Sequence, residues 1–249
     1  MIRVIVKENQ ANGAFNNGEI LESKPIGFPQ DGGEIKPYSN LFYWAHAWTT
    51  NKSSTIGLHP HQGFEICSFV LKGYINHFDT KLNSWIRLEE GDMQVIRSGS
   101  GISHSEEIGE KSEIFQIWFD PDISKTLLND ATYDDYKKDV LKKIKSNNYT
   151  KKIIKGDGSP VELISENITI NELFFNSGTF KHNLNMDLMS SMFVLDGEAE
   201  FNNHLIKKGD FIIIEDEQML NIKCDSYIKL FEINSPKNPS YDTYFQRFG

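Results

Sequence analysis

The chain has 249 residues, a formal net charge of -9 at pH 7 and 39% hydrophobic residues, which is enough to bury a core in one large domain or two smaller ones. The acidic balance argues against a direct nucleic-acid ligand, and no apolar run approaches the ~18 residues that a membrane-spanning helix needs. Cys67 and Cys224 are too few for a disulfide framework, and residues 1–6 lack the pattern of a signal peptide, so we expect a soluble cytoplasmic protein.

Short segments rich in β-branched and aromatic residues recur along the chain, separated by clusters of Gly, Asn, Asp and Pro. This pattern predicts an all-β sandwich or barrel with little helix. The only stretch with helical and linker character is 121–160. Its lysine-rich part, 137–145, could form a short amphipathic helix with Val140, Leu141 and Ile144 inward, but we prefer a solvated connector.

Two parts of the chain share one pattern. Residues 69–73 read FVLKG and are followed by Gly91-Asp92 and an apolar run, while residues 193–197 read FVLDG and are followed by Gly209-Asp210 and an apolar run. The shared glycines suit turns and the apolar runs suit buried strands. We therefore predict two β-domains, 1–120 and 161–249, joined by the linker 121–160.

Two triplets in the first domain carry side chains that bind metals. His59-Pro60-His61 and His104-Ser105-Glu106 each place such side chains at i and i+2, which face the same way on a β-strand. Two such strands would bring three imidazoles and one carboxylate together and leave one or two positions open on a first-row transition metal. That arrangement is typical of a catalytic metal site.

The second copy lacks these ligands when positions are counted from the shared glycines. The counts from Gly197 and Gly209 lead to Asn183, Asn185, Met189, Ile222 and Cys224. His182 and His204 do not fall on matched positions in this count. We therefore predict one metal ion per chain, bound in the first domain.

Residues 58–106 resemble the pirin family of the cupin superfamily. The segments that carry the resemblance are HPHQGFE at 59–65, GDMQ at 91–94 and SGSGISHSE at 98–106, and it continues through QIW at 116–118. The resemblance implies two tandem cupin barrels of the double-stranded β-helix or jelly-roll type, with one divalent metal in the first. It also selects His59, His61, His104 and Glu106 as the ligands. Segment 28–50 and the tail 235–249 depart from the family pattern.

Several residues have alternative interpretations. Glu65 occupies the position where many other cupins carry a glutamate ligand, so it competes with Glu106. Cys67, on the same strand face as Glu65, is read as a small apolar filler. His77 and His46 are read as packed residues, while the case for Gln94 and Gln116 as donors to a ligand rests on the resemblance.

The resemblance implies two functions. In the first, iron, or else Mn, Ni, Cu or Zn, serves a quercetin 2,3-dioxygenase-like enzyme that cleaves a flavonol-like aromatic substrate with O2, and Glu106 accepts the substrate hydroxyl proton. In the second, the protein is a non-enzymatic, metal- or redox-dependent regulator that binds a transcription factor or a metabolic enzyme. A metal that only clamps the barrel fits the open coordination positions least well. We expect a monomer.

Overall fold

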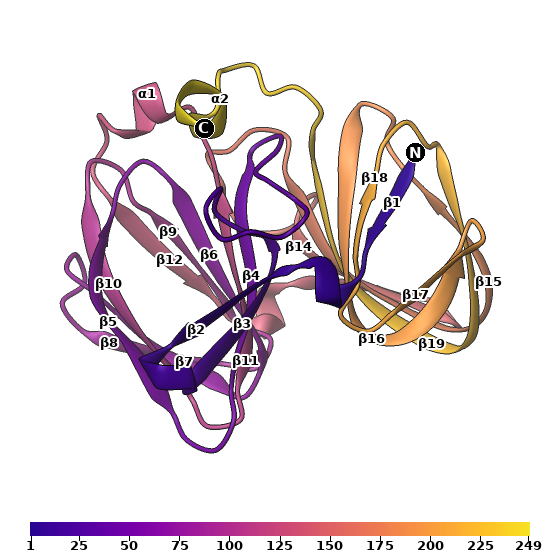
Figure 1. Cartoon of the computed structure of the whole chain (residues 1–249), viewed down its shortest axis with the longest axis horizontal. Coiled ribbons are helices and arrows are strands. Elements are labelled where there is room, and N and C mark those ends of the chain that lie inside the picture. Colours follow the sequence, from indigo (N-terminus) through magenta and orange to yellow (C-terminus); the bar gives the residue numbers. More distant parts are fainter. The chain divides into compact units, whose positions relative to one another are not determined.

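The computed structural model describes all 249 residues and confirms the all-β prediction, with only two short α-helices, α1 (Ile123–Thr126) and α2 (Tyr244–Phe248) (Figure 1). No helix in it has both the length and the apolar character needed to cross a membrane. The 3-10 turns are η1 (Lys7–Asn9), η2 (Asn16–Gly18) and η3 (Lys138–Val140).

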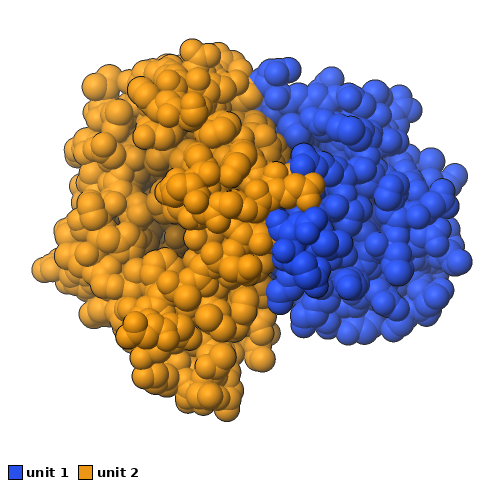
Figure 2. All heavy atoms as spheres, in the orientation of Figure 1, with its two compact units in different colours: residues 1–9, 139–162, 166–238 blue, residues 10–138, 163–165, 239–249 orange.

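The chain folds into two compact units (Figure 2). The first barrel comprises residues 10–138, 163–165 and 239–249, and the second barrel comprises residues 1–9, 139–162 and 166–238. These units differ from the domains expected from the sequence at both termini, because the first nine residues group with the second barrel and the last eleven with the first. Whether 1–120 and 161–249 fold independently stays a prediction.

The first barrel is built from two antiparallel sheets. The larger sheet consists of β2 (Ala11–Phe15), β3 (Ile20–Ile26), β4 (Leu41–Thr49), β6 (Glu65–Lys72), β9 (Met93–Arg97), β11 (Glu113–Phe119) and β12 (Thr132–Tyr136). The smaller sheet consists of β5 (Ser54–His61), β7 (Tyr74–Asp79), β8 (Trp85–Glu89) and β10 (Ile102–Ile108). Their strand orders are β12-β9-β6-β11-β4-β3-β2 and β5-β10-β7-β8.

The second barrel is one eight-stranded sheet. Its strands are β1 (Ile2–Ile5), β13 (Lys142–Lys145), β14 (Tyr149–Lys155), β15 (Thr169–Asn183), β16 (Leu188–Phe201), β17 (His204–Lys207), β18 (Phe211–Ile214) and β19 (Met219–Pro236). The order is β1-β18-β16-β19-β15-β14-β13, with β17 paired to β16. Bulges at 176–178 in β15 and at 194–196 in β16 allow these long strands to bend.

Strand alternation explains where the cores lie. In β10, Ile102, His104, Glu106 and Ile108 are buried on the same side of the strand, as the period of two requires. A buried aliphatic cluster joins strands of both sheets of the first barrel: Ile20, Ala47, Val70, Ile75, Leu88, Ile108 and Ile114. The second barrel has its own larger apolar core, drawn mainly from β15, β16, β18 and β19. Each unit thus buries a core of its own.

The segment 121–160, expected from the sequence to be a solvated linker, has regular structure of its own. It contains strands β12, β13 and β14, and no α-helix forms at 137–145, where a 3-10 turn precedes β13. Leu141 is buried, whereas Val140 and Ile144 are exposed, so the side chains do not form the inward face expected of a helix. The lysines of β13 lie on an edge strand, where positive charge protects the free edge from pairing with another chain.

Candidate metal centre

Strands β5 and β10 bring the two predicted triplets together. The two strands lie side by side (Figure 1). They pair antiparallel, with His104 directly opposite His59. The Nε2 atom of His104 lies 3.0 Å from Nε2 of His61 and 3.0 Å from Nε2 of His59. The parity argument therefore places three imidazole nitrogens around one point inside the first barrel.

The three imidazoles fit a metal ion. Around a first-row ion with bonds of about 2.0–2.1 Å, tetrahedral ligand nitrogens lie roughly 3.3 Å apart, close to the spacing in this cluster. Nδ1 of His59 lies 2.7 Å from the carbonyl oxygen of Gly57, and donation to that oxygen leaves Nε2 with its lone pair for a metal. Nδ1 of His104 is buried without a hydrogen-bond partner.

The electrostatics of the cluster keep two imidazoles neutral at pH 7. Burial, followed by the neighbouring imidazoles of His104 and His59, lowers the pKa of His61 to about 3. Burial and the nearby His59 likewise lower the pKa of His104 to about 3. A neutral imidazole has an unprotonated nitrogen and can bind a metal without first releasing a proton.

Glu106 is buried beside the cluster, and three donors hold its carboxylate. The Ser68 hydroxyl and the Gln94 amide each donate to Oε1 over 2.7 Å, and the Gln116 amide donates to Oε2 over 2.6 Å. A potential ligand atom of Glu106 lies within 4.8 Å of one on His104 and of one on His77. The carboxylate is therefore adjacent to the imidazoles, but its nearest contacts are hydrogen-bond donors.

Glu65, the competing carboxylate, lies elsewhere in the first barrel. It is buried on β6, three residues from Ser68 and hence on the opposite face of that strand. Its oxygens accept hydrogen bonds from the backbone N–H groups of Ile164 and Ser165 and from the Ser165 hydroxyl, over 2.6–2.7 Å. Arg97 lies 3.7 Å away. Glu65 thus fastens residues 163–165 to the first barrel.

The other histidines and cysteines singled out from the sequence are packed residues. His77 is fully buried with Nε2 2.8 Å from Asp79 Oδ2, and His46 lies 3.4 Å from Glu113. Cys67 is fully buried, and burial raises the pKa of its thiol. A small filler is the role expected of such a cysteine.

Sequence reasoning missed part of the polar network around Glu106. Ser68 contacts the carboxylate directly, and the Tyr133 hydroxyl donates to Oε1 of Gln94 over 3.2 Å. Tyr133 also stacks on His77, with ring centroids 4.6 Å apart. Inward parity on β6 could have indicated Ser68, but no local signal pointed to Tyr133, which lies in the presumed linker.

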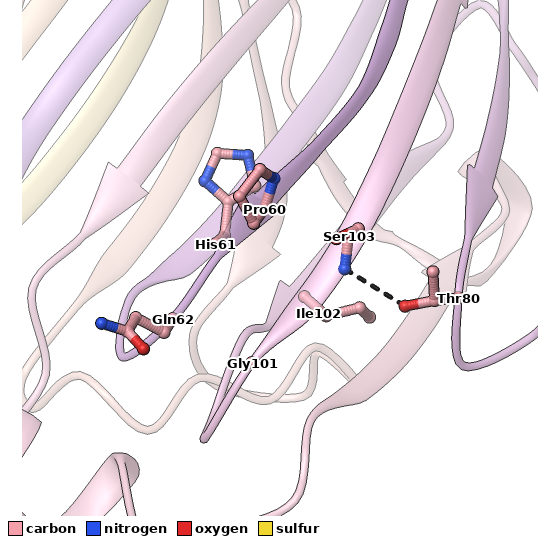
Figure 3. Close-up of a pocket in the computed structure, with 7 residues that line it drawn as sticks. All are labelled: Pro60, His61, Gln62, Thr80, Gly101, Ile102 and Ser103. Carbon is pink, nitrogen blue, oxygen red and sulfur yellow. Dashed lines mark hydrogen bonds between the residues drawn. The ribbon is translucent and has the colours of Figure 1, made fainter.

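A surface pocket of about 540 Å³ opens beside the cluster and reaches His61 (Figure 3). Its lining residues are Pro60, His61, Gln62, Thr80, Gly101, Ile102 and Ser103. The backbone N–H of Ser103 donates to the Thr80 hydroxyl over 3.1 Å, which ties two walls of the pocket together (Figure 3). This volume lies in the range of small-molecule sites.

Strand register aligns the second barrel with the first. The repeated motif begins at Phe69 on β6 and at Phe193 on β16. Phe69 pairs with Phe115 of β11, and Phe193 pairs with Phe231 of β19. Positions counted from Phe115 and Phe231 are therefore equivalent in the two barrels, whatever the lengths of the loops.

By this register, Leu220 takes the place of His104, since each lies eleven residues before its phenylalanine. His182 pairs with Leu220 as His59 pairs with His104, so His182 is the counterpart of His59. Nε2 of His182 lies 2.7 Å from the buried carboxylate of Glu232.

The sequence-based count is therefore wrong by one residue where it matched Asn183 with His59, and by two residues where it matched Ile222 with His104. Its match of Met189 with Glu65 stands. The hairpins between the shared glycines and the ligand strands differ in length, which a fixed count cannot register. The remaining three ligand positions carry aliphatic side chains: Leu184, Leu220 and Ile222. The second barrel thus has no equivalent set of ligands.

Comparison with known proteins agrees with this geometry. Residues 31–119 match the Pirin family model. The chain is 36% identical over 69 residues to quercetin 2,3-dioxygenase of Escherichia coli K12 and 45% identical over 65 residues to a pirin-like protein of Caulobacter vibrioides. These matches cover 26% and 25% of this chain, and it spans less than a third of either relative, 29% and 28%.

The whole fold resembles solved structures. The bacterial pirin YhhW from Escherichia coli in complex with nickel(II) superposes with a TM-score of 0.75 at 20% identity, covering 95% of this chain and 99% of that one. The two barrels therefore have the cupin fold, as the resemblance implied.

Proposed function

We propose that the chain, whose residues 31–119 match the Pirin family model, is a metal-dependent dioxygenase that acts on flavonol-like aromatic substrates. The observation that carries the proposal is the convergence of three imidazole Nε2 atoms beside a buried, hydrogen-bonded carboxylate at a pocket open to solvent. The quercetin 2,3-dioxygenase name of the Escherichia coli relative supports the choice of substrate class.

We propose that His59, His61, His104 and Glu106 hold one divalent ion, with iron as the native metal. A bound first-row ion would polarise a substrate hydroxyl and supply the redox chemistry that O2 requires. The neutral state of His61 and His104 supports this assignment, because neither imidazole must release a proton before it binds the ion.

Glu106 is proposed to accept the proton of the substrate hydroxyl. Its Oε1 already accepts two hydrogen bonds, from Ser68 and Gln94, while Oε2 accepts one, from Gln116. A carboxylate oxygen has two acceptor positions, so Oε2 retains a single one. That position would bind the ion first and would have to leave it when the carboxylate takes the proton. The three donors hold the carboxylate still, and a fixed base needs little reorganisation during proton transfer.

The pocket beside His61 is proposed to bind the aromatic rings of the substrate. Pro60 and Ile102 offer apolar surface, and Gln62 offers an amide for a peripheral hydroxyl. Planar aromatic ligands suit sites that combine apolar walls with a few polar groups. A ligand seated there would exclude water from the side of the cluster that faces solvent.

Oxygen uptake with quercetin tests the proposal. Glu106→Gln should lower turnover by ~10²–10⁴ while lowering metal content far less, because removal of a positioned general base acts on the chemical step. Glu65→Gln is the matched control, since it makes the same charge change on a carboxylate outside the cluster. An iron-loaded wild type that takes up no oxygen with quercetin would reject the enzyme.

The alternative is a non-enzymatic regulator that binds a protein partner, and one observation supports it. The outward face of the smaller sheet exposes Leu58 on β5 by 58% and Trp85 on β8 by 55%. Exposed apolar side chains on one sheet face suit a protein partner. Cytoplasmic location and a monomeric state stay predictions.

A further inference from the structure

Trp118 lies near the end of β11 and makes one polar contact that leads to the candidate metal centre. Its indole Nε1–H donates to Oε1 of Gln116 over 3.1 Å. The amide of Gln116 in turn donates to Oε2 of Glu106 over 2.6 Å. A chain of two hydrogen bonds therefore joins the indole to the carboxylate.

This chain can run in only one direction. An indole N–H can only donate, and an ionised carboxylate can only accept. Gln116 therefore has to present its oxygen to Trp118 and its NH2 group to Glu106. Without the indole N–H, the amide could turn over and present its oxygen to the carboxylate, which would remove one donor and add a repulsive contact.

The ring of Trp118 also touches the imidazole cluster. It meets His61 edge to face, with centroids 4.8 Å apart and planes at 89°. Three further rings hold it from other sides, with centroids 5.4–5.7 Å away: Phe28, Tyr43 and Phe64. One side chain, fixed by packing, thus contacts His61 directly and Glu106 through Gln116.

We propose that Trp118 is a positioning residue of the metal centre, which orients the Glu106 carboxylate through the Gln116 amide and supports the ring of His61. The inference rests on the metal site proposed above, but not on any oxygenase activity. Tyr133 orients Gln94 toward the other oxygen of Glu106 in a parallel way, although a tyrosine hydroxyl can also accept.

A double-mutant cycle on metal affinity tests the proposal. Trp118→Phe keeps an aromatic ring and removes the donor, while Gln116→Leu removes the amide and keeps the size. Nickel(II) titration of the full chain should show each variant binding about 10-fold more weakly, as typical for residues that orient ligands. The double variant should bind about as weakly as either single one, because both changes break one chain.

The visible spectrum of the cobalt(II)-loaded protein supplies a second readout. It should shift in both single variants, since the geometry around the ion changes. Trp85→Phe, at an exposed position on β8, is the matched control and should alter neither affinity nor spectrum. Melting of the metal-free variants reports separately on folding.

Multiplying losses in the double variant would overturn the proposal, because Trp118 would then act by packing alone, and so would unchanged affinity and spectrum in Trp118→Phe. Should Trp118→Phe fail to fold, the NMR resonance of the Trp118 indole N–H proton, measured in the Gln116→Leu variant, provides the test instead. The resonance should shift and the proton should exchange faster, and an unchanged indole would overturn the proposal.

A wild type that binds nickel but takes up no oxygen with quercetin would reject the dioxygenase alone, whereas one that binds no ion would reject both.

Discussion

Replacement of Glu65 by alanine should destabilise the first barrel and leave the metal in place. The carboxylate of Glu65 accepts three hydrogen bonds from residues 164–165. It lies on the face of β6 opposite to Ser68, which contacts Glu106 beside the imidazoles. Alanine removes the acceptor and leaves the donors where they are. The variant therefore separates a structural carboxylate from a metal-binding one.

The magnitude follows from the orphaned donors. Ser165 is buried, so its N–H and hydroxyl lose their partner without access to water, at roughly 1–3 kcal/mol each. Burial raises the pKa of Glu65, against the opposing effect of the hydrogen bonds from Ser165 and Ile164 and of Arg97, so the charge itself adds little stability. The expected loss is about 4 kcal/mol, which corresponds to a fall in melting temperature of roughly 10 °C.

Thermal melting and elemental analysis of the same samples provide the assay. Glu65→Gln is the matched control: it keeps the shape and one acceptor oxygen, so about half the loss is expected, again with wild-type metal content. Glu106→Ala should show the converse, with less metal per chain. Loss of metal from Glu65→Ala with an unchanged melting temperature would refute the reasoning and make Glu65 the ligand.

Three further outcomes are expected. His61→Ala should remove most of the bound metal, whereas His182→Ala and His204→Ala should not, by elemental analysis; equal loss in all three would contradict the single site. Chelation should lower the free energy of unfolding only by the contribution of metal binding, about 3 kcal/mol when the metal is in hundredfold excess over its Kd, and the melting temperature should fall accordingly. Far-ultraviolet dichroism should stay intact, since each barrel has its own core. Burial raises the pKa of Asp120 to about 6. Between pH 4 and 6 the folded chain therefore binds more protons than the unfolded chain, and the free energy of unfolding rises as the pH falls through that window. Asp120→Asn should abolish that gain, about 1–2 kcal/mol, when melting is compared at pH 4.5 and 7; an identical pH dependence would contradict the assignment.

The sequence by itself determined the all-β fold and the shared facing of His59 and His61. Alternation with period two is a local property of strands, so His59 and His61 must share a face wherever β5 lies. The repeated FVL and GD segments likewise indicated two similar barrels. A metal-ligand set with this spacing could therefore be predicted before any tertiary contact was known.

The resemblance favoured Glu106 over Glu65, but only the tertiary structure shows where each carboxylate lies. Both carboxylates are near the histidines in sequence and both suit a metal, but Glu65 lies on β6 with the opposite facing and meets Ser165, a hundred residues away. No local pattern encodes such a contact. The same holds for Tyr133, whose strand β12 pairs with β9.

The second barrel illustrates the same division. Its lack of a full ligand set could be predicted from the amino-acid sequence, because no second His-x-His motif occurs. The place of His182 could not, because it depends on which residues β15 and β19 pair. Register follows from hydrogen bonding between strands that are distant in the chain, and loops of unequal length hide it from any count along the sequence.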